Sequence, residues 1–351
     1  MTVRIGLVGC GHIGFVHSYT LLQLIRHGLV DAEVRDTYDV DPSRADAFAA
    51  PHGARPAPSL AALLDDVDAV WVCTWTAAHL EVVTAAAERG LAVFCEKPLG
   101  PNLADCERVA SSLAGVPHQV GLVLRHAPVF RELAERVADP ATGRPLAAVF
   151  RDDQYFPNQG MYASDWRSDA RRAGGGTLIE HSIHDVDILR WLLGDPILVQ
   201  ASVASRFAHP GIDDVAAVTF TFPDGAVATL TSVWHQILTR GSTRRLEVFC
   251  EDALLWLDDD LVGPLHVETS AGATTIPTEP PPWVQRLDPP PVLARAVAEY
   301  APPTKAFLDA LAAGSDPVGE PDAATALAAH RLVDAAYRSA TTGEAVMPTP
   351  R

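Results

Sequence analysis

The chain has 351 residues, of which 48% are hydrophobic and 20% are charged. One hydrophobic core rarely serves more than about 250–300 residues, so we expect two domains. The formal net charge of −17 argues against nucleic acid or a membrane surface as a partner, because no basic run is present, and it indicates simple solubility. No apolar stretch approaches the roughly 20 residues of a membrane span.

The first strand pattern starts almost at residue 1, so the sequence predicts no cleavable signal peptide. Five cysteines are present without a CxxC pair. They are Cys10, Cys73, Cys95, Cys106 and Cys250. An odd number without regular spacing indicates reduced, mostly buried thiols and predicts a cytoplasmic protein.

Strand and helix patterns alternate along roughly the first 120 residues, which predicts a parallel, doubly wound α/β sheet. The expected strands are 4–8, Ala32–Val40, Ala69–Cys73, Ala92–Cys95 and Gln119–Leu124. The expected helices follow Gly14 and then cover Ser43–Ala50, Ser59–Leu64, Ala78–Arg89 and Leu103–Leu113.

Long strand patterns dominate from about residue 145, with one helix interrupting them, so a mostly antiparallel sheet is expected there. The strands are Leu146–Phe156, Ile197–Phe207, Val215–Phe222, Ala226–Ile237 and Arg245–Phe249, and the helix is 175–193. The proline-rich segment 277–303 is interpreted as an ordered surface loop, with a disordered arm as the alternative. Helices Thr304–Ala313 and Pro321–Thr341 are expected to follow it.

A GxGxxG turn directly follows the first strand pattern. Gly9 would permit the tight turn, Gly11 a close approach to a pyrophosphate, and Gly14 close packing of the next helix. That helix would offer free N–H groups to the phosphates, with His12 and Ile13 in its first turn. The motif therefore predicts dinucleotide binding; the alternative is a tight turn that binds no ligand.

Asp39 ends the second strand pattern, 25 residues after Gly14. An acid there can accept both adenosine ribose hydroxyls and repels a 2′-phosphate, which favours NAD over NADP. Asp36 and Asp41 compete with it for this role.

Glu96-Lys97-Pro98 follows the strand Ala92–Cys95. Ligands of open α/β sheets bind beyond the carboxyl ends of strands, so Lys97 is predicted to reach the reactive end of the cofactor. There a lysine can stabilise negative charge as a substrate hydroxyl loses its proton. The alternative is a surface lysine beside a turn.

A triple glycine at 174–176 opens a helix pattern that carries Glu180 and His184 four residues apart. On one α-helical face, a carboxylate that orients an imidazole makes a general base. The alternatives are a metal site, disfavoured because no second ligand cluster is evident, and a polar helix end with satisfied core histidines. We therefore expect no metal.

Together these motifs resemble the Gfo/Idh/MocA family of sugar and cyclitol dehydrogenases, over nearly the whole chain. The Glu-Lys-Pro motif combined with the glycine–histidine helix makes the resemblance specific. The resemblance also depends on Asp39, Thr74…His79, Arg125…Pro128, Asp187 and Tyr337-Arg338-Ser339…Gly343.

The resemblance implies an NAD-binding Rossmann domain over 1–124 and a substrate-binding α/β domain over 125–351. The second domain would have a large, mostly antiparallel, open-faced sheet, and its C-terminal helices could pack back on the first domain. The exposed sheet face would form a homodimer or homotetramer.

The resemblance also implies residue roles. Lys97 would contact substrate and nicotinamide, and His184 would be the catalytic histidine, with Glu180 as its partner. Glu180 and Ser182 stand where the family usually has aspartate and glycine, which bears on substrate identity. The expected cofactor-binding set adds Thr74, His79, Glu96 and Lys97 to the glycine loop and Asp39. The expected substrate-binding set is Lys97, Arg125, Tyr155, Trp166, Arg167, Glu180, His184 and His235. For the aromatic members, and for Trp234, packing in the core is the alternative.

The sequence thus predicts an NAD(P)-dependent dehydrogenase that transfers hydride between a secondary alcohol of a sugar, polyol or cyclitol and nicotinamide, with NAD preferred. Two other functions stay open. One is a glycoside hydrolase that oxidises its sugar transiently with tightly held NAD. The other is a cofactor-sensing regulator without turnover.

Overall fold

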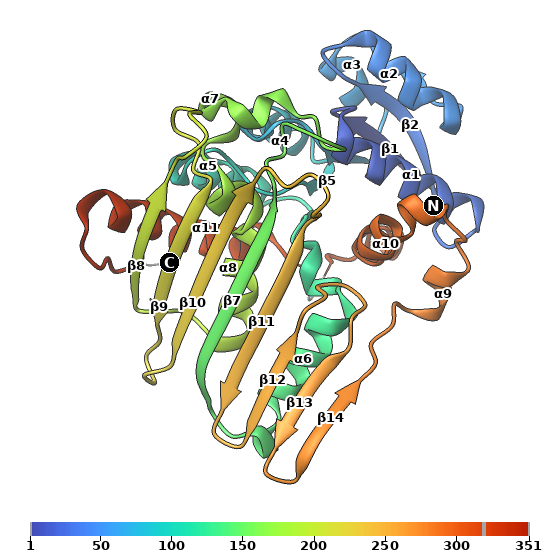
Figure 1. Ribbon diagram of the computed structural model, residues 1–351. Coiled ribbons are helices and arrows are strands. Elements are labelled where there is room, and N and C mark those ends of the chain that lie inside the picture. The colour runs from blue at the N-terminus through green and yellow to red at the C-terminus, as the bar shows by residue number, and fades with distance from the viewer. Residues whose placement is uncertain (1, 318–320, 350–351) are drawn as a thin grey trace. The chain divides into compact units, whose positions relative to one another are not determined.

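The computed structural model describes residues 2–317 and 321–349 (Figure 1). The chain divides into two compact units. The first contains residues up to 123 together with 281–327, and the second contains residues 124–280 together with those from 328 onward. Segment 281–327 therefore groups with the first unit, although it lies within the range expected for the second domain.

The first unit is built on a six-stranded parallel sheet in the order β3-β2-β1-β4-β5-β6. The strands are β1 (Val3–Val8), β2 (Ala32–Tyr38), β3 (Arg55–Pro56), β4 (Ala69–Val72), β5 (Ala92–Cys95) and β6 (His118–Val120). This confirms the predicted doubly wound sheet. The strand order reverses between β1 and β4, which is where such sheets open a crevice for ligands.

The helices of this unit start where the sequence supplies capping side chains. The Ser59 hydroxyl accepts the Ala62 N–H at 3.2 Å, and the Asn102 side chain accepts the Asp105 N–H at 3.0 Å. The helices are α1 (His12–Arg26), α2 (Pro42–Ala49), α3 (Leu60–Leu64), α4 (His79–Ala87), α5 (Leu103–Leu113), α9 (Pro282–Gln285) and α10 (Pro291–Ala312). Short 3-10 turns cover Ala50–His52 and Thr76–Ala78.

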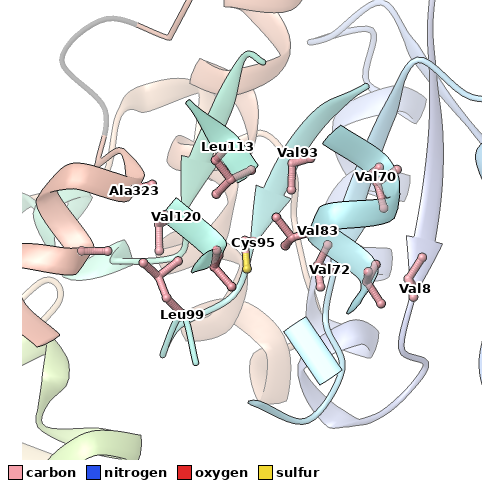
Figure 2. Packing of buried hydrophobic residues seen from close by; sticks show 14 of the residues in the cluster. Val8, Val70, Val72, Val83, Val93, Cys95, Leu99, Leu113, Val120 and Ala323 are labelled. Carbon is pink, nitrogen blue, oxygen red and sulfur yellow. The ribbon is translucent and has the colours of Figure 1, made fainter. Parts of the chain in front are cut away.

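One face of the sheet buries an aliphatic cluster against α4 and α5 (Figure 2). Figure 2 labels Val8, Val70, Val72, Val83, Val93, Cys95, Leu99, Leu113, Val120 and Ala323 as members. Burial of these side chains fixes the carboxyl ends of β1, β4 and β5, which carry the glycine loop and the Lys97 turn.

Two expectations for this unit were wrong. The strand expected over Gln119–Leu124 ends at Val120, and 123–126 form a 3-10 turn. The proline-rich segment is not simply a loop, because α10 begins at Pro291 and continues through Pro302 and Pro303. Its buried residues recur at helical spacing, and this burial outweighs the two backbone hydrogen bonds that prolines cannot donate. Val297, Ala301, Thr304 and Leu308 show this spacing, and Pro303 and Phe307 are buried as well.

The second unit contains an eight-stranded sheet in the order β14-β13-β12-β11-β7-β10-β9-β8. Among the described strands of this sheet, β7 and β10 form the only parallel pair, so the predicted mostly antiparallel sheet is confirmed. The strands are β7 (Pro145–Tyr155), β8 (Leu198–Ala204), β9 (Val215–Thr221), β10 (Val227–His235), β11 (Thr243–Cys250), β12 (Ala253–Leu257), β13 (Leu265–Thr269) and β14 (Gly272–Ile276). The strands β12, β13 and β14 were not predicted from the sequence.

The two faces of this sheet differ in burial. Along β7, Ala148, Phe150 and Asp152 are buried, whereas Val149 and Arg151 between them are exposed. Helix α6 (Pro128–Ala138) contacts β12 of this sheet, and helix α8 (Ile183–Leu193) contacts β7 (Figure 1). The remaining helices are α7 (Ala170–Ala173) and α11 (Ala323–Thr342), and 3-10 turns cover Pro140–Thr142 and Asp165–Ser168.

The helix expected over 175–193 is interrupted. Thr177–His181 form a single π-helical turn, and α8 starts only at Ile183. Glu180 therefore does not share a regular α-helical face with His184, and the expectation that their four-residue spacing puts them on one such face was wrong.

Among the helices of residues 2–317 and 321–349, none has both the length and the apolar character of a membrane span.

Candidate functional site

The glycine loop between β1 and α1 has little room for side chains at two of its three glycines. Gly9 has φ +93°, and a Cβ there would lie 2.6 Å from the Cys73 carbonyl. A Cβ on Gly14 would lie 2.1 Å from the Gly9 oxygen. Around Gly11 the space is open to 4 Å within the described residues. The loop is thus tight on its inner side and open at Gly11, as close approach of a ligand to the backbone requires.

Helix α1 begins at His12, directly after Gly11, and Ile13 lies in the same first turn. Among the described residues, no side chain caps this helix end. An uncapped helix N-terminus beside an open glycine loop offers backbone donors and partial positive charge to a pyrophosphate. These residues therefore fit the diphosphate of a dinucleotide.

Asp39 is joined to this loop through its carboxylate. One oxygen accepts the Cys10 N–H at 2.7 Å, and the other accepts the Asp41 N–H at 2.9 Å. The competing acids have other partners. Asp36 is fully buried in a two-bond ion pair with Arg55, and Asp41 caps α2 through the Ser43 N–H. The geometry thus favours Asp39 as the acid near a ribose.

The turn after β5 carries Lys97. The Glu96 side chain is buried, and its carboxylate accepts the Lys97 N–H at 3.1 Å. His79 contacts the same turn, with its Nδ1 2.9 Å from the Pro98 carbonyl oxygen and its Nε2 3.3 Å from the Thr74 carbonyl oxygen. The peptide bond between Lys97 and Pro98 is cis. Thr74, His79, Glu96 and Lys97 are therefore neighbours at the carboxyl ends of β4 and β5.

In the second unit, the backbone of the π-helical turn is held by Asp213. Its carboxylate accepts the Gly176 N–H at 2.7 Å, the Leu178 N–H at 3.0 Å and the Tyr337 hydroxyl at 2.8 Å. Burial raises the pKa of Asp213 above its ordinary value, and these hydrogen bonds offset part of that rise. A Cβ on Gly176 would lie 1.8 Å from the backbone carbonyl oxygen of Asp213, so glycine is required there. Asp213 was not among the predicted site residues, because it belongs to no recognisable sequence motif.

Glu180 is buried within this turn and pairs with Arg167, whose Nε lies 3.3 Å from Glu180 Oε2. Arg167 also donates to the Ser164 hydroxyl at 3.0 Å and lies over the Trp166 ring at 4.3 Å. Three of the expected substrate-binding residues thus form one group, and the ion pair ties segment 164–168 to the turn that carries Glu180.

His184 lies in the first turn of α8 and is 6% exposed. Just before it, Ser182 donates to Asp152 Oδ2 at 2.7 Å and lies 2.6 Å from the Ser232 hydroxyl. The same Asp152 oxygen is 2.9 Å from His181 Nδ1. A serine at this position, where the family resemblance suggests glycine, therefore supplies a buried hydrogen bond that anchors the start of α8 on β7.

The other expected substrate-binding residues engage protein partners. Arg125 pairs with buried Asp187 through two bonds of 2.6 and 2.7 Å. The buried Tyr155 hydroxyl accepts the Met161 N–H at 3.2 Å, and His235 Nε2 lies 3.4 Å from Asp153 Oδ2. Trp234 packs against Phe156 in the core and is only 1% exposed.

A second buried charged group includes Asp185, in the first turn of α8, and was not anticipated. Arg244 contacts Asp185 at 2.6 Å and Asp260 at 2.7 Å, and its Nε is 3.8 Å from Asp152. Burial raises the pKa of Asp185 to about 7, against the opposing effect of Arg244. Within the described residues, no group of three or more His, Cys, Asp or Glu residues could hold a metal ion.

Comparison with known proteins assigns both units to one family. Residues 3–122 match the model of the oxidoreductase family with an NAD-binding Rossmann fold, and residues 130–255 match the GFO/IDH/MocA C-terminal domain. The chain belongs to the Gfo/Idh/MocA family of oxidoreductases. It is therefore an NAD-dependent oxidoreductase, and the family, fold class, enzyme class and cofactor expected from the sequence are confirmed.

Individual relatives agree with this assignment. Inositol 2-dehydrogenase 3 of Saccharopolyspora erythraea is 37% identical over 243 residues, covering 64% of this chain and 65% of its own. Inositol 2-dehydrogenase of Paracoccus denitrificans is 30% identical over 285 residues, covering 78% of each chain. The solved structure of levoglucosan dehydrogenase in complex with NADH has the same fold, with a TM-score of 0.86 at 22% identity and full coverage of both chains.

Proposed function

We propose that this Gfo/Idh/MocA protein oxidises a secondary alcohol of a sugar, polyol or cyclitol, or reduces the corresponding ketone. The observation that carries the proposal is the pairing of an open glycine loop, joined to Asp39, with Glu96-Lys97-Pro98 at the carboxyl end of β5. The names of the inositol 2-dehydrogenases among its relatives support a cyclitol or sugar as substrate.

The proposed roles follow from the chemistry of the side chains. His184 accepts the proton of the substrate hydroxyl, and Lys97 donates a hydrogen bond to the oxygen as negative charge develops there. Bound NAD supplies the hydride acceptor. Glu180, held by Arg167, orients His184 or binds a neighbouring hydroxyl. The other proposed substrate-binding residues are Arg125, Tyr155, Trp166, Arg167 and His235.

The glycine loop would hold the pyrophosphate through the N–H groups of the first turn of α1, which contains His12 and Ile13. Asp39 would accept the ribose hydroxyls. Its carboxylate would repel a 2′-phosphate, so we propose a preference for NAD over NADP. Thr74 and His79 would line the nicotinamide side, since they neighbour the Lys97 turn.

The test is a panel of cyclitols, aldoses and uronates, each incubated with purified protein and NAD while the absorbance of reduced nicotinamide is followed. The proposal predicts net NADH formation with at least one member of this panel. Glycoside cleavage without net absorbance change would instead identify a hydrolase with transient oxidation. Tight NAD binding without turnover on the whole panel would identify a sensor.

We also propose that the exposed face of the second unit's sheet joins copies of this chain in a homodimer or homotetramer. Val149, Val227 and Phe249 are 45%, 37% and 39% exposed, and their strands β7, β10 and β11 are adjacent. Nearby charges are already paired, as in Arg245 with Glu247 at 2.8 Å. A face of apolar side chains and neutralised charges suits a second copy of itself.

A cytoplasmic location is proposed on the state of the thiols. All five cysteines are free and buried. Reduced thiols without disulfides are typical of proteins from reducing compartments.

A further inference from the structure

Helix α1 and the Lys97 turn are linked by a buried hydrogen bond that no motif predicted. His17, on the second turn of α1, places its Nε2 2.7 Å from Glu96 Oε1. The His17 side chain is fully buried, and that of Glu96 is 4% exposed. Because a carboxylate only accepts hydrogen bonds, the His17 nitrogen donates.

The Glu96 carboxylate uses its two oxygens for two different structural elements. Oε1 accepts from His17 on α1, and Oε2 accepts the backbone N–H of Lys97 at 3.1 Å. The helix that follows the glycine loop is therefore connected through one side chain to the backbone of Lys97. A shift of α1 or of the turn would break one of the two bonds.

The surroundings leave this carboxylate little freedom to move. A Cβ on Gly121 would lie 2.8 Å from Glu96 Oε1 and 3.0 Å from Oε2. The His17 ring is itself fixed by the edges or faces of two aromatic rings, Phe94 at 5.0 Å and Tyr300 at 5.1 Å between centroids.

We propose that His17 is a positioning residue for Lys97, acting through Glu96. It holds the carboxylate where it fixes the Lys97 backbone, and it keeps that backbone in register with the helix that binds the pyrophosphate. The inference rests on the proposed role of Lys97 in turnover. Loss of the His17 bond would leave NAD binding largely intact but would misplace the lysine amine, and small displacements of reacting groups cost about a hundredfold in rate.

Three variants separate positioning from general stability. His17→Leu removes the donor, whereas His17→Gln places an amide N–H near the position of Nε2. Gly121→Ala leaves His17 unchanged but crowds the Glu96 carboxylate. Thr20→Val is the matched control, because Thr20 is buried on the same helix and its hydroxyl has no partner among the described residues.

Two readouts are compared on each folded variant. The first is amide hydrogen exchange at Lys97, measured by mass spectrometry with fragmentation or by NMR, which needs no substrate. The second readout is the pair of kcat and the dissociation constant for NAD, both measured on the same variant. We expect His17→Leu and Gly121→Ala to exchange the Lys97 amide about tenfold faster and to lose about tenfold to a hundredfold in kcat, with the NAD constant changed less than about threefold.

His17→Gln should restore most of the amide protection and of kcat, and Thr20→Val should match wild type in both. If His17→Leu keeps wild-type exchange at Lys97, the positioning role is overturned. If it loses kcat only in proportion to unfolding, and glutamine gives no rescue, the role is purely structural and the proposal also fails. If wild type itself turns over no alcohol, the proposed function fails, while the exchange result still decides whether His17 fixes the Lys97 backbone.

Discussion

At the scale of single residues, the three acids near the end of β2 have different roles, although the sequence alone made them alternatives. Asp36 is buried against Arg55, and Asp41 caps α2. Asp39 contacts the glycine loop itself through the Cys10 N–H. The sequence could predict that an acid reads the ribose, but only the side-chain partners separate the three candidates.

Replacing Asp39 by serine should shift the cofactor preference towards NADP. The substitution removes the negative charge that repels a 2′-phosphate, so we expect the ratio of kcat/KM for NAD to that for NADP to fall by about tenfold or more. Steady-state kinetics with both cofactors measure this ratio. Asp41→Asn is the control, since asparagine can still cap α2. An unchanged ratio in Asp39→Ser would move the role to another acid.

At the scale of elements, sequence patterns predicted the strands and helices that carry their own signals. Ser59 and Asn102 cap α3 and α5 at the predicted starts. The π-helical turn at 177–181 was not predictable, because it depends on Asp213, which is distant in sequence. Likewise the proline content of 277–303 favoured a loop, whereas α10 runs through the prolines and buries Val297, Ala301 and Thr304 at helical spacing.

The same limit applies to the candidate site. The glycine loop and the Glu-Lys-Pro turn follow directly from local motifs and lie at strand ends as predicted. The partners of the site residues do not, because His17–Glu96 and Arg167–Glu180 join segments 79 and 13 residues apart. Such pairs arise from tertiary packing. No local pattern in a single sequence predicts which distant residues will come into contact.

The buried group around Arg244 predicts a pH dependence of stability. Burial raises the pKa of Asp185 to about 7 from its ordinary value of 3.8. Between these values the folded protein binds a proton that the unfolded chain does not, so this residue makes the free energy of unfolding fall as pH rises from about 4 to about 7. The slope is at most about 1.4 kcal/mol per pH unit for one proton.

Asp185→Asn should flatten that part of the stability profile, because asparagine does not titrate and its oxygen can still accept from Arg244. Urea unfolding at several pH values measures the difference from wild type. The exposed Asp46→Asn controls for the change in net charge. A variant whose stability changes with pH as steeply as wild type would show that Asp185 does not hold this proton.

At the scale of the whole molecule, the exposed face of the second unit's sheet is the surface that we expect to be covered by another copy of the chain. Its apolar side chains lie on central strands, and large exposed apolar patches on sheets promote association. We expect the wild-type protein to be a dimer or tetramer by light scattering. Val149→Glu should shift it to smaller species, because a carboxylate would be buried without a partner at the interface.

Val292→Glu is the matched control, since Val292 is 77% exposed on α10 in the other unit. It should leave the oligomeric state unchanged. A monomeric wild type, or an unchanged mass for Val149→Glu, would contradict the proposed interface.

The most direct test of the proposed enzyme is the turnover of Lys97→Ala beside wild type, with the best alcohol of the panel and saturating NAD. The lysine is proposed to stabilise the developing alkoxide but not to hold the pyrophosphate. We expect NADH formation by Lys97→Ala to fall by about a thousandfold or more, while the dissociation constant for NAD stays near that of wild type. Wild-type turnover in Lys97→Ala would contradict it.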